Sequence, residues 1–288
     1  MKELSMNKLS LLKLGFLALL IFALALPGYS KSIKFVQISD IHYSSDSNAS
    51  SSRDVSQSAV NLRFAVQSIM KQDVDFVMFL GDSTDKSDPH EIISFLRCVQ
   101  KIKKPFYFVI GNHDAHKLAG IDKESYIKLI NIYDPYQKSK KPYYYFKPSK
   151  DVLAVVMDGA SDFAPTAHGN YSKEMVTWLD KILEKNKDKV VLIFQHFPLI
   201  APTDNYSHTT LEIDPYMELL CKYKNIALIS SGHFHADKVV VDENGIHHIS
   251  VPALLNKPSI YEVVNVNYSK KHFTPPTEVK VEISRIKL

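Results

Sequence analysis

Five near-continuous apolar runs are spread along the chain, and polar residues follow each run at once. They cover residues 33–39, 76–80, 106–110, 190–194 and 226–230. Short runs rich in β-branched and aromatic residues are typical of strands buried on both faces. Between and around them, apolar residues recur at helical spacing over residues 54–71, 89–101, 123–131, 172–186 and 212–223. This alternation predicts an α/β fold that begins as βαβ units.

The polar residues that follow these runs are of a kind that binds metal ions. In open sheets of buried strands, ligands bind outside the carboxyl ends of the strands, so we expect the five clusters to meet at one rim. The candidate metal ligands in these clusters are Asp40, His42, Asp82, Asn112, His196, His233 and His235.

The ligand types limit which ions could bind. Carboxylate and amide oxygens together with imidazole nitrogens suit Mn, Fe or Zn better than a soft metal that prefers thiolates. Seven ligands are too many for one ion that keeps a position open for water, but they serve two ions if one carboxylate bridges. We assign the bridge to Asp82. Taken alone, each Asp or Asn after a strand could instead form a turn or cap a helix.

The motifs Asp-x-His, Gly-Asp-x-x-Asp, Gly-Asn-His-Asp, a lone His and Gly-His-x-His occur in this order between Asp40 and His235. The set resembles the calcineurin-like metallophosphoesterase superfamily. The resemblance implies a four-layer αββα sandwich of two mixed sheets flanked by helices. It also implies two divalent or trivalent metal ions, one held by Asp40, His42, Asp82 and His235, the other by Asp82, Asn112, His196 and His233.

The resemblance further implies how the site works. A metal-bridged hydroxide would attack phosphorus, so no protein nucleophile is required. His113 would stay off the metals and act as general acid toward the leaving group, or stabilise the charged transition state. The carboxylate of Asp85 would orient His113, as carboxylates commonly orient catalytic imidazoles.

The chain changes character after residue 238. Short strands are expected at 238–241, 245–250, 261–267 and 278–285, with a turn at 242–245. These look like a second, more antiparallel sheet. Upstream, Ser172 is a candidate N-cap for the helix that contains Trp178, and we expect Trp178 to pack in the core.

The first thirty residues have the parts of a secretory signal. Three lysines precede an apolar run at 14–26, and Pro27, Gly28 and Ser30 follow it. We therefore expect a signal peptide at 1–30, a single catalytic domain at 31–288, and a periplasmic or secreted protein. An uncleaved membrane anchor is the alternative, but the run is shorter than the roughly 20 residues that span a bilayer.

Charge and cysteines add two expectations. Loss of residues 1–30 would lower the formal net charge from +4 to +2, which is too weak a bias to indicate a nucleic-acid partner. Export would permit a disulfide between Cys98 and Cys221. Both lie in predicted amphipathic helices, however, so we expect free cysteines that act as small buried hydrophobes. Neither a stable membrane anchor after signal cleavage nor a particular oligomeric state is indicated.

The most specific interpretation is a phosphodiesterase acting on a small soluble phosphate ester, similar to class III cyclic-nucleotide phosphodiesterases. Lys86 and Asp114 disfavour the protein Ser/Thr phosphatases, and His42 disfavours the purple acid phosphatases. The alternatives are an exported phosphomonoesterase and a non-catalytic metal- or ligand-binding protein. Loops at 43–53, 115–120 and 197–213 should wall the pocket, with His116, Tyr206 and His208 as candidate substrate contacts.

Overall fold

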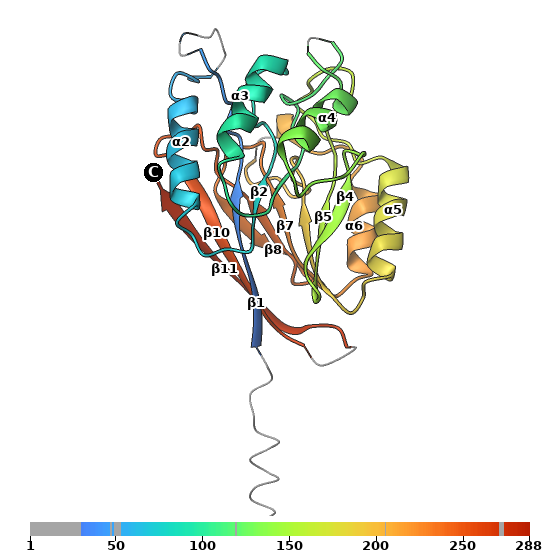
Figure 1. Cartoon of the computed structure of the whole chain (residues 1–288). Coiled ribbons are helices and arrows are strands. Elements are labelled where there is room, and N and C mark those ends of the chain that lie inside the picture. The colour runs from blue at the N-terminus through green and yellow to red at the C-terminus, as the bar shows by residue number, and fades with distance from the viewer. Residues whose placement is uncertain (1–29, 47, 49–52, 119, 205, 271–273) are drawn as a thin grey trace, which may run out of the picture.

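The computed structural model describes residues 30–46, 48, 53–118, 120–204, 206–270 and 274–288 (Figure 1). The predicted signal peptide, apart from Ser30, lies outside the described residues. None of the helices in the described part of the chain is both long and apolar enough to cross a bilayer.

In the described part of the chain, eleven strands form two mixed sheets. The five-stranded sheet has the order β11-β10-β1-β2-β3, and the six-stranded sheet has the order β4-β5-β6-β7-β9-β8. The first sheet comprises β1 (Ser30–Ile38), β2 (Phe76–Phe79), β3 (Phe106–Phe108), β10 (Ile260–Ser269) and β11 (Thr277–Lys287). The second comprises β4 (Tyr144–Ser149), β5 (Val152–Val156), β6 (Val190–Phe194), β7 (Ile226–Ser231), β8 (Lys238–Val241) and β9 (His247–Ser250).

Helices cover the outer face of each sheet. Among the described residues the helices are α2 (Ser58–Ile69), α3 (Pro89–Val99), α4 (Lys123–Tyr133), α5 (Lys173–Glu184) and α6 (Asp214–Cys221), with a 3-10 turn at Tyr206–His208. Leu62, Ile92 and Tyr126 of the first three helices pack with β1 and β2. Leu179 and Leu219 of the last two pack with β5 and β6, on the opposite flank in Figure 1.

A third apolar layer lies between the sheets. It includes Phe35 of β1, Phe194 of β6 and Val264 of β10. Alternate residues along a strand face opposite sides, so continuous apolar runs such as Val190–Phe194 are buried on both faces. The predicted four-layer sandwich is confirmed.

The carboxy-terminal strands do not form a sheet of their own, so that prediction is wrong. Strand β9 runs parallel to β7, and β8 pairs with β9, so both extend the six-stranded sheet. Strand β10 instead pairs antiparallel with β1 from Ser30 to Gln37, and β11 pairs with β10. Alternating hydrophobicity shows that a segment is a strand but not which edge it joins. Here each sheet needed further strands to cover the shared apolar layer.

Two local predictions had different outcomes. Ser172 is the N-cap of α5, and its side chain accepts a hydrogen bond from the amide of Met175, as expected. Cys98 and Cys221 are free. The expectation that both are buried is wrong for Cys221, which is exposed at the end of α6, while Cys98 is partly buried.

Candidate metal centre

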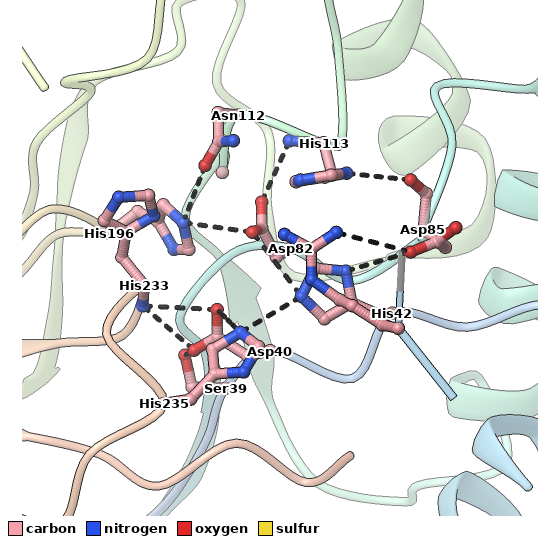
Figure 2. Close-up of polar contacts among 12 residues, drawn as sticks. Ser39, Asp40, His42, Asp82, Asp85, Asn112, His113, His196, His233 and His235 are labelled. Atoms are coloured by element: carbon pink, nitrogen blue, oxygen red, sulfur yellow. Dashed lines mark hydrogen bonds and ion pairs between the residues drawn. The ribbon is translucent and has the colours of Figure 1, made fainter. Parts of the chain in front are cut away.

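The five motifs meet at one rim, although their strands belong to two sheets. Asp40 and His42 follow β1, Asp82 follows β2, and Asn112 follows β3. From the other sheet, His196 follows β6, and His233 and His235 follow β7. The carboxyl ends of the two sets of parallel strands therefore face one another across the sandwich, and Figure 2 shows the side chains converging.

The backbone at this rim is unusual. Five of the seven candidate ligands have positive φ angles between +44° and +69°: Asp40, His42, Asp82, His233 and His235. Non-glycine residues rarely adopt this left-handed conformation, and such strain clusters at functional sites. The positive φ turns the chain sharply off each strand and directs the side chain back over the rim.

Two glycines of the motifs allow the rim to close. Gly81 has a φ of +92°, and a Cβ there would lie 2.6 Å from Nδ1 of His196. At Gly232 a Cβ would lie 1.9 Å from Oγ of Ser39. A side chain at either position would push the loops of the two sheets apart.

One group of ligand atoms consists of Asp40, His42 and His235. Nε2 of His235 lies 3.3 Å from Oδ1 of Asp40 and 3.2 Å from Nε2 of His42. Ser39 and the amide of His233 donate hydrogen bonds to the Asp40 carboxylate. These donors fix the carboxylate in place, with Oδ1 3.3 Å from Nε2 of His235.

The second group consists of Asp82, Asn112, His196 and His233. Nε2 of His196 lies 3.4 Å from Oδ2 of Asp82 and 3.3 Å from Oδ1 of Asn112. One nitrogen of His233 also lies within 4.8 Å of the ligand atoms of Asp82 and His196. The same Oδ2 of Asp82 is 3.7 Å from Nε2 of His42, which belongs to the first group. Asp82 thus lies between the two groups.

Hydrogen bonds fix which imidazole nitrogen faces the centre. Nδ1 of His196 donates to the carbonyl oxygen of Leu80 at 2.8 Å, which leaves its Nε2 for a metal. Nε2 of His233 donates to the carbonyl oxygen of Ala167 at 2.8 Å, which leaves its Nδ1. Metal-binding histidines commonly use the second nitrogen in this way, so the donor set fits divalent cations.

The pKa shifts of the buried candidate ligands also fit a site for cations. Burial raises the pKa of Asp82, but the imidazoles of His196, His113 and His42 together outweigh burial and hold that pKa well below its usual value. Burial lowers the pKa of His196, but the carboxylates of Asp82 and Asp40 and the carbonyl of Leu80 together outweigh burial and raise the pKa to about 9. The buried carboxylate thus needs positive charge beside it, which bound cations would also supply.

His113 lies beside the metal-ligand groups, but its predicted partner contacts it differently. Its amide donates to Oδ1 of Asp82 at 2.9 Å, and its Nδ1 donates to the main-chain carbonyl of Asp85 at 2.8 Å. The carboxylate of Asp85 lies 3.5 Å from Nδ1 of His42 instead. The prediction that the carboxylate of Asp85 orients His113 is therefore corrected: the main chain of Asp85 does so.

Asp114 is a structural member of the site that the sequence analysis used only to separate subfamilies. It is fully buried, and its carboxylate accepts hydrogen bonds from the amides of Ser83, Thr84 and Gly111. It joins the loops that carry Asp82 and Asn112. Its place inside the Gly-Asn-His-Asp motif was the available signal.

A cavity of about 480 Å³ opens above the ligands. Asp82, Asn112, His113, His233 and His235 form its floor, and Arg53, Pro165, Thr166, Ala167, His208 and Phe234 contribute walls. Among the predicted substrate contacts, His208 lines this cavity, whereas His116 is buried and does not line it. The side chain of Tyr206 lies outside the described residues. No sequence motif singled out Arg53 as a contact, or the lining residues 165–167, which follow β5.

This fold and this set of oxygen and nitrogen ligands define a metal-dependent phosphoester hydrolase. The family model of calcineurin-like phosphoesterases matches residues 33–237, and the chain belongs to this family.

Three similar proteins illustrate the family. A probable glycerophosphodiester phosphodiesterase, GpdQ, of Arcobacter nitrofigilis is 27% identical over 69% of this chain and 71% of its own length. The 3′,5′-cyclic adenosine monophosphate phosphodiesterase CpdA of Haemophilus influenzae is 24% identical over 77% and 76%. A dimetal phosphatase from Danio rerio shares the fold, with a TM-score of 0.67 and 16% identity over 87% of this chain and 98% of its own.

Proposed function

We propose that the protein is an exported phosphodiesterase that uses two metal ions to hydrolyse a small soluble phosphate ester. The observation that carries the proposal is the position of Asp82, whose Oδ2 lies 3.4 Å from His196 and 3.7 Å from His42. A carboxylate that lies between two groups of metal ligands can bind the ions of both groups. One ion would be held by Asp40, His42, Asp82 and His235, and the other by Asp82, Asn112, His196 and His233.

The ligand types favour Mn, Fe or Zn as the metals. Two such ions, when bound, supply the Lewis acidity and the activated water that phosphoester hydrolysis requires. The remaining chemistry belongs to the side chains around them.

His113 is the residue placed to handle the leaving group. Since its Nδ1 is engaged by the carbonyl of Asp85, its Nε2 is the nitrogen that can reach the cavity that His113 lines. From there it would donate a proton to the departing oxygen, or stabilise the charge that develops on it. The guanidinium of Arg53 on the cavity wall adds a positive charge for a phosphate oxygen.

The diester preference is supported by two relatives whose names describe phosphodiesterases, GpdQ and CpdA. A phosphomonoesterase remains the second candidate, because two metal ions can activate water for attack on a monoester as well as on a diester. A non-catalytic binding protein has no use for His113 beside a complete ligand set. Export rests on the charged, apolar and small-residue parts of residues 1–30.

The deciding experiment compares hydrolysis of bis-p-nitrophenyl phosphate with that of p-nitrophenyl phosphate, with Mn²⁺, Zn²⁺ or Fe²⁺ added and with EDTA. Metal-dependent turnover of the diester is expected. Turnover of the monoester alone would replace the proposal by a phosphatase, and no turnover of either ester would favour a binding protein. Export is tested separately, by cell fractionation and by the amino-terminal sequence of the mature chain, which should begin near residue 31.

A further inference from the structure

A second hollow lies away from the metal centre, where the outer strands of the two sheets meet. Strand β3 is the last strand of one sheet and β4 the first of the other. The rings of Tyr107 on β3 and Phe146 on β4 stack with their centroids 3.6 Å apart. The groove beside them has a volume of about 430 Å³, and none of the residues that line it also lines the metal-centre cavity.

Seven aromatic side chains line this groove, including Trp178, the single tryptophan of the chain. Some of them close the open side of the sandwich: Tyr107 and Phe146 stack, and the hydroxyl of Tyr144 bonds to Gln137 and to the main chain of Phe108. Tyr143 and Trp178 at the mouth also pack against the apolar cluster beneath α5, as expected for Trp178, whereas Tyr145 is left largely exposed.

The rings at the mouth form a partly open platform. Trp178 packs edge to face on Tyr143 at 4.9 Å between centroids, and Tyr145 lies 6.5 Å from Trp178 at a tilt of 36°. Tyr145 is 46% exposed although it is large and aromatic. Exposed aromatic groups gathered at a hollow are typical of binding sites.

Two lysines, Lys138 and Lys141, line the groove, and Lys138 donates a hydrogen bond to the main-chain carbonyl of Asp134. Residues 138–150 contain five lysines and no acidic residue. Nζ of Lys141 lies 5.0 Å from the ring centroid of Tyr143 and 3.1 Å from its hydroxyl. Glu174 of α5 borders the groove, where it accepts a hydrogen bond from the same hydroxyl. Lysines beside stacked rings favour a ligand that is both planar and anionic.

We propose that this groove is a second binding site, for a nucleotide. The base would stack on Trp178 and Tyr145, since every base has a face suited to aromatic rings. The phosphate would be neutralised by Lys138 and Lys141. The nucleotide could be a free mononucleotide or one residue of a single strand, because both offer the same base and phosphate.

Trp178 provides a local probe for the test. Its fluorescence is followed in EDTA, so that nothing is hydrolysed at the metal centre, while AMP, adenosine, ribose 5-phosphate or an oligoadenylate is added. AMP is expected to quench the fluorescence of Trp178 saturably. Its binding should be about tenfold tighter, or more, than that of adenosine or ribose 5-phosphate. If the oligoadenylate binds much more tightly than AMP, the natural ligand is a single strand. If the two bind equally tightly, the natural ligand is a free nucleotide.

Matched variants locate the site. The double variant Lys138→Glu/Lys141→Glu should weaken AMP binding by about tenfold or more. Glu174→Gln should strengthen AMP binding, because it removes a negative charge beside the groove. Lys71→Glu, an exposed lysine just after α2, is the charge control. Asp82→Asn should leave quenching unchanged, which separates this groove from the metal centre. Lys138 and Lys141 are both exposed, so we expect the double variant to fold. Retained circular dichroism and diester turnover would show that it does.

Three results would overturn the proposal. These are the absence of quenching up to millimolar AMP, equal affinity for AMP and adenosine, and equal weakening by Lys71→Glu and the double variant. Because the readout is binding in EDTA, none of them bears on the phosphodiesterase proposed for the metal centre.

Discussion

The main-chain carbonyl of Asp85 accepts the hydrogen bond of His113 at 2.8 Å, while its carboxylate lies 3.5 Å from Nδ1 of His42 (Figure 2). One residue thus orients two imidazoles by two different groups. The carbonyl holds a histidine expected to serve the leaving group, and the carboxylate holds one expected to bind metal. Substitution of the Asp85 side chain should therefore act on His42, and on Arg53, whose guanidinium lies 3.9 Å from the same carboxylate, and should leave the hydrogen bond of His113 intact.

Asp85→Ala should weaken metal binding by about 10- to 100-fold, the usual effect of removing an outer partner of a metal-bound histidine. At saturating metal, kcat should stay within about threefold of the original, because the carbonyl remains. Turnover is measured against free Mn²⁺ concentration, with Asp162→Ala, a partly exposed carboxylate, as control. Unchanged metal affinity with a large loss of kcat would return the orienting role to the carboxylate.

His113→Ala should lower kcat by about 10²- to 10⁴-fold, the range that general acids contribute. Metal content, measured by elemental analysis, should not change, since Nδ1 of His113 is bonded to the Asp85 carbonyl and the ring is not among the assigned metal ligands. The loss should be larger for an alkyl diester than for a p-nitrophenyl diester, whose leaving group needs little protonation. Equal losses for the two esters would favour charge stabilisation, and unchanged turnover would refute both roles.

Asp82→Asn should empty or disorder both metal positions, because its carboxylate lies between the two ligand groups. Asp40→Asn should affect chiefly one position, because the Asp40 carboxylate lies beside Nε2 of His235 in the first group and contacts the second group only through the main-chain amide of His233. Metal-to-protein ratios from elemental analysis separate the two outcomes, with Asp162→Asn as the control. Retention of two metals by Asp82→Asn would contradict the bridging assignment.

Gly81→Ala should destabilise the fold and weaken metal binding. The new methyl group would meet Nδ1 of His196 at 2.6 Å, in addition to the cost of a side chain at a φ of +92°. Gly245→Ala is a matched control, because Gly245 has a φ of +83° and no atom lies within 4 Å of its added Cβ. In urea unfolding, we expect the free energy of unfolding to fall by about 1 kcal/mol for Gly245→Ala and by about 2–4 kcal/mol for Gly81→Ala. Equal costs would show that His196 can move aside.

Glu262 should make stability fall as pH rises. It is fully buried on β10, where it accepts a hydrogen bond from Gln37 at 2.7 Å. Burial raises its pKa to about 7 from 4.5, although Gln37 and then Arg285 oppose the shift. The native state therefore holds this proton more tightly than the unfolded state does. Its stabilisation is complete below pH 4.5 and is lost as pH rises through 7, on the order of 3 kcal/mol.

Urea unfolding of the metal-free protein between pH 4.5 and 8 measures this effect without interference from metal release. Glu262→Gln should remove most of the pH dependence, because an amide keeps the shape of the protonated acid and does not titrate. An unchanged slope in that variant would assign the pH dependence to other groups.

Much of the site could be predicted because its determinants are local. A buried parallel strand delivers the residues after it to one rim, so a motif such as Asp40-Ile-His42 carries both a ligand type and its place. Short-range chemistry such as the capping of α5 by Ser172 follows from residues three positions apart. For these features the sequence alone determined the residues and their arrangement along the chain.

Other features depended on contacts between distant segments. Which sheet β8 to β11 join is decided by pairing across the whole chain and by the shared apolar layer, and strand periodicity carries no information on either. At Asp85 the main-chain carbonyl contacts His113 where the carboxylate was expected, and residues 165–167 line the cavity. Both features follow from how the loops of the two sheets pack at the rim. The sequence by itself thus determined the chemical groups and the rim they occupy. Only the tertiary structure decided which atom of each group faces which partner, because that depends on backbone conformations set by packing.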